Sequence, residues 1–202
     1  MLERLRNTPQ SPRYHPEGSV WNHTMLVVDE AAENRNKSAD PRSFMWAALL
    51  HDIGKPSTTM RRKGKITSYD HDKAGARLTR EFLGAFTADT DFIERTAQLI
   101  RYHMQPLFVG RNLPFADVKG MSRNTDVGEV ALLGLCDRRG RQGADRRQEQ
   151  ENMRAFLEEC KLQSGGRLYE SKSGQPERQR GQNPIQPGHD HRQHPPGQRD
   201  DR

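Results

Sequence analysis

ALLHDIGKP, residues 48–56, is the stretch from which the fold and the candidate chemistry of this sequence are best derived. On a helix, His51 points to the same side as Ala47 and Ala48, because it follows them at a spacing of four and three residues. Asp52 comes next in the chain. Burying an imidazole and a carboxylate costs several kcal/mol unless a partner compensates them. This pair therefore requires either hydrogen-bonding partners or a bound cation.

The helix that contains this pair is expected to begin at Asp40–Pro41, where a capping side chain precedes proline at the first helical position. Its apolar side is made by Phe44 and the residues that follow at helical spacing. We expect it to end near Ile53, with Gly54 in the left-handed conformation that commonly follows a helix.

Apolar residues recur at helical spacing on both sides of this segment, which predicts an all-α bundle of about six to seven helices. The other expected helices span 20–34, 71–86, 91–104, a poorly defined stretch within 114–121, 126–137 and 144–163. Residues 57–70 contain Lys63–Gly64 between short polar stretches, which favours a brief hairpin or an ordered loop.

The chain is expected to have three parts. Residues 1–19 are expected to be extended, because three prolines and Gly18 discourage a helix there. Residues 20–163 form the helical domain. Residues 164–202 are rich in Gly, Gln, Pro, Arg and His and cannot bury enough apolar area to offset the entropy of ordering, so we expect a disordered tail.

Composition excludes some classes of protein. Hydrophobic residues make up 32% of the 202 residues, and no run approaches the roughly 20 apolar residues that span a bilayer. The N-terminus lacks the apolar stretch of a signal peptide, so we expect a cytoplasmic protein with no membrane contact. Cys136 and Cys160 fit reduced thiols. The net charge of +6 mildly favours phosphate-bearing ligands and does not by itself indicate nucleic-acid binding.

Other histidines and carboxylates repeat the pattern of the first pair. His103 follows Leu99 and Ile100, and Asp137 follows Leu133, so both lie on apolar helix sides. A single buried histidine is commonly a hydrogen-bonded core residue, and a buried carboxylate is commonly salt-bridged or capping. A divalent cation would compensate several of them at once, and the residues alone leave both interpretations open.

The order His23, His51–Asp52 and Asp137 resembles the H…HD…D signature of the HD superfamily of metal-dependent phosphohydrolases. Four longer strings resemble the HD domain that follows the nucleotidyltransferase core in many bacterial CCA-adding enzymes: HPEGSVWNHT (15–24), ALLHDIGKP (48–56), YDHDKAGA (69–76) and LCDRRGR (135–141). The resemblance covers about residues 14–162 and implies an HD-domain helical bundle. No Gly-Ser strand-turn with paired carboxylates precedes it, so we expect the chain not to add CCA by itself.

The resemblance also implies a metal site, whose principal ligands would be His23, His51, Asp52 and Asp137. Imidazole and carboxylate donors suit Mn, Ni, Co, Fe or Zn and admit Mg less readily. We favour one ion, with Asp52 as the bridge in the case of two ions.

The candidates for catalytic roles are Asp52, His71, His103 and Lys55. His71 and His103 stand where some HD proteins have second-metal ligands and others have phosphate contacts or a general acid, and the sequence leaves these roles open. Lys55 follows the Gly54 turn and is placed to meet phosphate charge, for which Arg138 and Arg141 are weaker candidates. His15 is expected only to pack or cap.

Two classes of function remain. The resemblance implies a hydrolase of nucleotide phosphomonoesters or phosphodiesters, including 2′,3′-cyclic or 2′-phosphorylated ones, on free nucleotides or RNA ends. The alternative is a non-catalytic RNA-binding or partner module derived from a tRNA nucleotidyltransferase. Its support is the basic stretch Arg61–Lys65 and the arginine-rich segment Arg138–Arg147, through which we expect at most weak contact with RNA.

Overall fold

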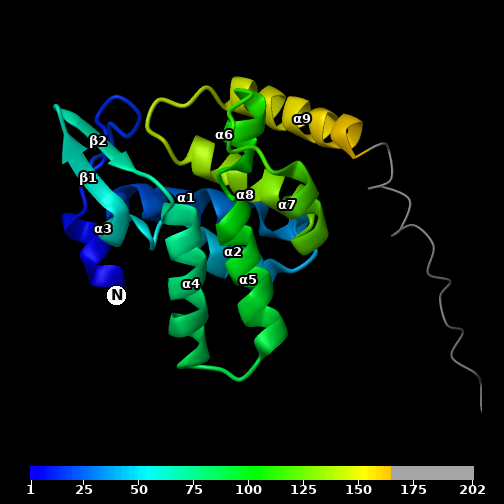
Figure 1. Ribbon diagram of the computed structural model, residues 1–202, viewed down its shortest axis with the longest axis horizontal. Helices are drawn as coiled ribbons and strands as arrows, with labels where there is room; N and C mark the ends of the chain where they lie inside the picture. The colour runs from blue at the N-terminus through cyan, green and yellow to red at the C-terminus, as the bar shows by residue number, and fades with distance from the viewer. Residues whose placement is uncertain (165–202) are drawn as a thin grey trace, which may run out of the picture. The chain divides into compact units, whose positions relative to one another are not determined.

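The computed structural model describes residues 1–164 of the chain. In this part, nine α-helices, two 3-10 helices and one two-stranded sheet follow one another along the sequence (Figure 1). Their bounds are η1 Leu2–Asn7, α1 Val20–Asn34, η2 Arg35–Lys37, α2 Pro41–Leu50, α3 Lys55–Thr58, β1 Thr59–Arg62, β2 Lys65–Ser68, α4 His71–Gly84, α5 Thr90–Tyr102, α6 Gln105–Gly110, α7 Val118–Asn124, α8 Val127–Arg139 and α9 Arg146–Gln163.

The expected helical bundle is confirmed, and the long helices match the expected ranges to within a few residues at their ends. Two short helices were not expected, α3 and α6. Each has a proline in its first turn, Pro56 in α3 and Pro106 in α6. Proline costs little there because the N–H that it lacks has no partner inside the helix. The two helices raise the number in residues 1–164 above the six or seven expected.

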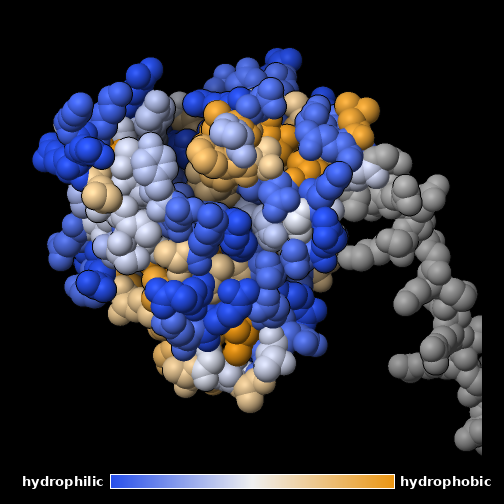
Figure 2. All heavy atoms as spheres, in the orientation of Figure 1, coloured by the Kyte–Doolittle hydropathy of each residue, from blue (hydrophilic) through white to orange (hydrophobic). Residues whose placement is uncertain are grey.

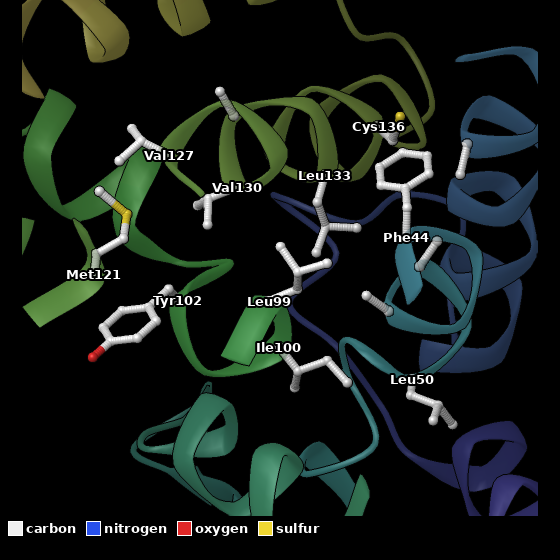
Figure 3. Close-up of a cluster of buried hydrophobic side chains, with 14 of the residues drawn as sticks. Phe44, Leu50, Leu99, Ile100, Tyr102, Met121, Val127, Val130, Leu133 and Cys136 are labelled. Atoms are coloured by element: carbon white, nitrogen blue, oxygen red, sulfur yellow. The ribbon is translucent and has the colours of Figure 1, made fainter. Parts of the chain in front are cut away.

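The helices pack around one apolar core. In Figure 1, α4 and α5 form an antiparallel pair, while α1 lies against α2 and α8, and α9 packs on α8. Figure 3 shows side chains from α2, α5 and α8 pointing toward one another, among them Phe44, Ile100 and Leu133, which are fully buried. Burial of each such side chain stabilises the fold by about 1.5–3 kcal/mol. Of these helices, α2 directly precedes His51 and Asp52, α5 directly precedes His103, and α8 carries Asp137, so the core sets the positions of these four candidate site residues.

The N-terminal segment differs from the extended conformation that we expected. Residues 2–7 form a 3-10 helix that buries Leu5 completely against α1, and turns follow through residues 12–17. The prolines that discourage a helix all come after residue 8. Residues 2–7 contain no proline, and the helix that they form buries Leu5.

Gly54 also differs from its predicted role. Its φ of −77° and ψ of −21° are right-handed, so it is not a left-handed C-cap residue. Glycine is needed there because of packing: a Cβ atom would overlap with the carbonyl oxygen of His71 and lie 2.6 Å from the backbone nitrogen of Gly75. The turn after His51–Asp52 can approach the start of α4 this closely only without a side chain.

Residues 59–68 form a hairpin, one of the two structures expected for this segment. β1 pairs with β2 in antiparallel register, with Thr59 opposite Ser68 and Arg62 opposite Lys65. Lys63 and Gly64 make the turn with φ values of 48° and 74°. Positive φ at both central residues is typical of the type I′ turn, which matches the twist of a two-residue hairpin.

Three further expectations concern the cysteines, the membrane and the tail. Cys136 and Cys160 are buried free thiols, as expected. None of the helices in residues 1–164 combines the length and hydropathy that crossing a bilayer requires. The expected disordered tail, residues 164–202, lies outside the described residues except for Ser164.

Candidate metal centre

Six histidine and aspartate side chains from five parts of the bundle meet in its interior. One comes from α1, two follow directly after α2, one begins α4, one follows α5 and one lies in the last turn of α8. All are buried, with exposed fractions between 0% and 8%: His23, His51, Asp52, His71, His103 and Asp137. The fold therefore brings together all four predicted ligands and both histidines whose role the sequence left open.

Asp52 is the centre of this group. Its Oδ2 lies 3.2 Å from His51 Nε2 and 2.7 Å from Lys55 Nζ, and its Oδ1 lies 3.5 Å from His71 Nε2. Both carboxylate oxygens of Asp52 therefore face other side chains of the site: Oδ2 faces His51 and Lys55, and Oδ1 faces His71.

His23 and Asp137 form the other half of the site. His23 Nε2 lies 2.9 Å from Asp137 Oδ1, although the two residues are 114 positions apart in the chain. The ring centroid of His23 is 5.5 Å from that of His51, which joins this half to the Asp52 half.

Backbone carbonyls fix the orientation of three of the histidine rings. The Nδ1 atoms of His51, His71 and His103 lie 2.9, 2.6 and 2.7 Å from the carbonyl oxygens of Ala48, Ser68 and Ile100, each three residues earlier. A carbonyl oxygen only accepts, so each Nδ1 carries the proton. In the neutral ring, Nε2 then carries a lone pair, and this lone pair faces the centre of the site.

This arrangement fits a bound cation. The lone pairs of His71 Nε2 and His103 Nε2 face each other at 3.3 Å. Buried His51 Nε2 has no hydrogen-bond partner within residues 1–164 and faces Asp52 Oδ2 at 3.2 Å, an oxygen that also contacts the ammonium of Lys55. Buried acceptors that point at one another repel unless a proton or a cation lies between them. Two overlapping groups have ligand atoms close enough to hold an ion, His23–His51–Asp52 and Asp52–His71–His103, and they share Asp52.

The pKa values of the site separate carboxylates from imidazoles. Burial raises the pKa of Asp52, but Lys55, His51 and His71 outweigh it and hold that pKa well below its usual range. Burial lowers the pKa of His103 to about 4, with the neighbouring His71 and His51 adding to the effect, and burial also lowers the pKa of His71. Near neutral pH Asp52 is thus ionised and His71 and His103 are neutral, the protonation states that divalent cations bind. Burial lowers the pKa of His23, but its contacts with Asp137 and Glu17 outweigh burial and raise that pKa, so a cation competes with a proton for this ring.

Two cationic side chains border the site. Lys55 Nζ donates to Gln10 Oε1 at 2.6 Å as well as contacting Asp52, and Arg141 Nη2 lies 3.4 Å from Asp137 Oδ2. Both of these predicted phosphate contacts lie beside the candidate ligands. Arg138 is half-buried, and no ion pair within residues 1–164 is recorded for it.

The sequence did not indicate the roles of Glu17 and Gln10. Glu17 Oε1 lies 2.8 Å from His15 Nδ1 and 2.9 Å from His23 Nδ1, so His15 belongs to a polar network, beyond the packing or capping expected of it. Gln10 accepts a hydrogen bond from the ammonium of Lys55 through its Oε1 atom. Glu17 is part of the string HPEGSVWNHT, two residues after a histidine, and this was the available signal. Gln10 stands in a proline-rich stretch without any pattern.

A cavity of about 590 Å³ lies outside this site, between α1 and the loop after α8. Its lining includes Trp21 and Met25 and none of the six clustered residues. Trp21 is two positions before His23, so the two side chains leave α1 on roughly opposite sides. The cavity therefore does not contain the six clustered side chains, but it borders them, because Glu17 and Arg141 line it and contact His23 and Asp137.

Comparisons with known proteins relate this sequence to one family and to several longer proteins. A family model described as HD domain matches residues 20–137, which include His23, His51, Asp52 and Asp137. The multifunctional CCA protein of Methylococcus capsulatus is 32% identical over 157 residues, 72% of this chain and 35% of the relative. The multifunctional CCA protein of Aromatoleum aromaticum is 29% identical over 150 residues, which are 70% of this chain and 35% of the relative. The multifunctional CCA protein of Actinobacillus pleuropneumoniae serotype 5b is 31% identical over 103 residues, which are 50% of this chain and 24% of the relative. The chain thus spans about a third or less of the length of these relatives.

Proposed function

This chain belongs to the HD domain family, and from that premise we propose that it is a metal-dependent phosphohydrolase of nucleotides. Its proposed substrates are phosphomonoesters or phosphodiesters, including 2′,3′-cyclic and 2′-phosphorylated nucleotides, free or at an RNA end. The observation that carries the proposal is the convergence of histidine Nε2 lone pairs on the buried carboxylate of Asp52.

We propose that His23, His51, Asp52 and Asp137 hold the principal ion. Their donor atoms are imidazole nitrogens and carboxylate oxygens, which suit Mn, Ni, Co, Fe or Zn better than Mg. When bound, such a cation acts as a Lewis acid toward the phosphoryl group and makes water a nucleophile near neutral pH.

The geometry of the site favours binding of a second ion, for which the sequence alone gave less support. Asp52, His71 and His103 form a group whose ligand atoms lie within 4.8 Å of one another, and Asp52 belongs to both groups. The Nε2 atoms of His71 and His103 carry lone pairs, so they are suited to bind a cation and poorly suited to donate a proton. We therefore favour a ligand role over a general-acid role for both, with Asp52 as the bridge.

Lys55 is the proposed phosphate contact. Its side chain is 12% exposed and its ammonium lies 2.7 Å from Asp52 Oδ2, so it neutralises the carboxylate and remains near the ligand group. A substrate phosphate bound at the metal centre would contact this ammonium at the edge of the site. Gln10 positions the amine by accepting a hydrogen bond from it.

Removal of metal is expected to abolish turnover. Protein treated with a chelator and then freed of it should hydrolyse neither 2′,3′-cyclic AMP nor 2′-AMP, and addition of Mn²⁺, Co²⁺ or Ni²⁺ should restore activity. The same ions should raise the melting temperature, because a ligand at 100 times its Kd stabilises the native state by about 2.7 kcal/mol. Hydrolysis that survives chelation unchanged would contradict the proposal.

The β1–β2 hairpin is the feature that favours an RNA-end substrate. Arg61, Arg62, Lys63 and Lys65 are exposed at its tip, and no ion pair with a residue of the described part of the chain is recorded for them. Arg62 and Lys65 stand directly opposite each other, and like charges in that position destabilise a strand pair. Figure 2 shows the tip as a strongly hydrophilic projection at the upper left. A polyanion would relieve this repulsion.

The other basic segment of the sequence supports RNA binding less. Arg141 contacts Asp137, and Arg147 pairs with Glu151. Arg139 donates to Gln150 and to the backbone of Arg146, which itself pairs with Glu30. Four of these arginines thus have partners within the fold, which leaves the hairpin as the stronger candidate contact.

Neutralising the hairpin is expected to separate RNA contact from chemistry. A variant with Arg61, Arg62, Lys63 and Lys65 changed to alanine should bind an RNA oligonucleotide at least 10-fold more weakly at low salt. The slope of the logarithm of the binding constant against the logarithm of the salt concentration should become shallower by up to about 3, since each contact with a single-stranded phosphate contributes about 0.7 to it. Hydrolysis of 2′,3′-cyclic AMP should be unchanged.

The matched control removes four exposed cations elsewhere, Arg35, Lys119, Arg123 and Arg154, with the same change in net charge. It should keep wild-type RNA affinity. Equal loss in both variants would mean that net charge alone attracts RNA. Retained RNA binding in a wild-type protein that shows no metal-dependent hydrolysis would favour the alternative, a non-catalytic RNA-binding module.

A further inference from the structure

Glu17 is a buried carboxylate at the outer side of the metal centre. Its side chain is 4% exposed, and it precedes the first residue of α1 by three positions. Oε1 lies 2.9 Å from His23 Nδ1 and 2.8 Å from His15 Nδ1, and Oε2 accepts from the backbone N–H of Gln142 at 3.3 Å. No ion pair with a lysine or arginine of residues 1–164 is recorded for it, so its partners are the two imidazoles and one amide.

His23 is the one histidine of the four innermost that has no backbone carbonyl at Nδ1. The rings of His51, His71 and His103 are oriented by carbonyl oxygens three residues earlier. His23 Nδ1 is buried and forms no well-aligned hydrogen bond with a described residue, so the approach of Glu17 Oε1 to 2.9 Å is the polar contact that compensates it. Its Nε2 faces Asp137 at 2.9 Å.

We propose that Glu17 is the positioning residue of His23: its carboxylate takes the Nδ1 proton and turns Nε2 toward the cation. The inference rests on the proposed metal site. A carboxylate behind a ligating imidazole fixes its tautomer and makes the ring a stronger donor than a neutral carbonyl does. His23 is then the most basic imidazole ligand of the centre. The amide of Gln142 ties Glu17 to the loop that follows α8, the helix that carries Asp137.

The same three residues permit another assignment. His15, Glu17 and His23 have ligand atoms within 4.8 Å of one another, so they could bind an ion directly. Both Nδ1 atoms lie at hydrogen-bonding distance from the same oxygen of Glu17, and His15 Nδ1 forms an aligned hydrogen bond with it, which favours positioning. The two assignments differ in the expected effect of removing His15, which matters for direct ligation and little for positioning.

The test measures metal affinity and ligand geometry. The Kd for Mn²⁺ is determined by competition with a chelating dye, and the visible absorption spectrum is recorded with Co²⁺ bound, in the full chain. Glu17→Gln is expected to weaken Mn²⁺ binding by about 10- to 100-fold, the usual effect of losing such a partner, and to change the Co²⁺ spectrum. His15→Ala should stay within about 3-fold of wild type in Kd and keep the spectrum.

Glu30→Gln is the matched control. Glu30 is a largely buried carboxylate of α1 that pairs with Arg146, away from the ligands, and its loss should leave the Kd and the spectrum unchanged. His23→Ala is the reference for loss of a ligand and should weaken binding more than Glu17→Gln does.

Wild-type Kd and spectrum in Glu17→Gln would overturn the inference, and so would a loss in His15→Ala as large as that in Glu17→Gln. Should Glu17→Gln lack the wild-type circular dichroism spectrum, Glu17→Asp carries the test. The shorter carboxylate keeps the charge but stands farther from His23, so Mn²⁺ binding about 10-fold weaker is expected and wild-type affinity would overturn the inference. A wild-type protein that binds no Mn²⁺ or Co²⁺ would contradict the proposed function itself, a result that differs from all of these.

Discussion

Changing His51 and Asp52 together to alanine is expected to reduce hydrolysis of 2′,3′-cyclic AMP to background, a loss of at least about 1,000-fold in kcat/KM. The change removes one imidazole ligand and the carboxylate shared by both ligand groups. It also leaves the ammonium of Lys55 without its carboxylate partner. Steady-state kinetics at saturating Mn²⁺, together with the Kd for Mn²⁺, measure the effect, and the affinity should fall with the activity.

The loss must arise without unfolding to support the proposed roles. The pair follows α2 and its side chains are surrounded by polar atoms, so the apolar core made by Phe44, Leu50 and Ile100 remains in place. The far-ultraviolet circular dichroism of the metal-free variant should therefore match that of metal-free wild type. Activity equal to wild type in the folded double variant would remove the assignment of this site.

Gly54→Ala is expected to destabilise the protein by about 3 kcal/mol or more, at the upper end of the cost of overpacking. The new methyl group would overlap with the carbonyl oxygen of His71, and backbone atoms on both sides must move to make room. For a domain of this size the melting temperature should fall by roughly 6–12 °C in a thermal scan. The displaced residue is His71, so Mn²⁺ binding should weaken as well.

Gly84→Ala is the control for this prediction. Gly84 is the last residue of α4, and a Cβ atom there would meet nothing within 4 Å. Alanine is favoured over glycine in a helix, so this variant should be as stable as wild type or more stable by up to about 1 kcal/mol. Equal destabilisation by both changes would mean that the loss of glycine itself, and not the contact with His71, is the cause.

Local sequence signals predicted the long helices well. In α1 the apolar residues recur at helical spacing, and the helix spans the expected residues 20–34. Asp40 caps α2 through Ser43 N, as a capping residue before proline should. The helical spacing also predicted that His51, His103 and Asp137 lie in the interior, because each follows buried apolar residues by three or four positions and therefore lies on the same side of its helix.

The features that the sequence did not predict depend on contacts between distant residues. Gly54 has an ordinary helical backbone, and the reason for glycine lies 17 and 21 residues further along, at His71 and Gly75. Glu17 acquires its role only when α1 brings His23 beside it and the loop after α8 supplies Gln142 N. No periodicity runs through the segment before α1, so the burial of Leu5 had no local signal, and for Glu17 the only signal was its place in the string HPEGSVWNHT.

The separation of His23 and Asp137 along the chain has a consequence for unfolding. An ion held by both would act as a cross-link between the first and the eighth helix, closing a loop of more than 100 residues. A covalent link of that span lowers the entropy of the unfolded chain by an amount worth about 4.7 kcal/mol. A coordinated ion would restrain the chain similarly for as long as both bonds persist. Metal-loaded protein should therefore populate unfolded conformations less often than metal-free protein and resist proteases longer.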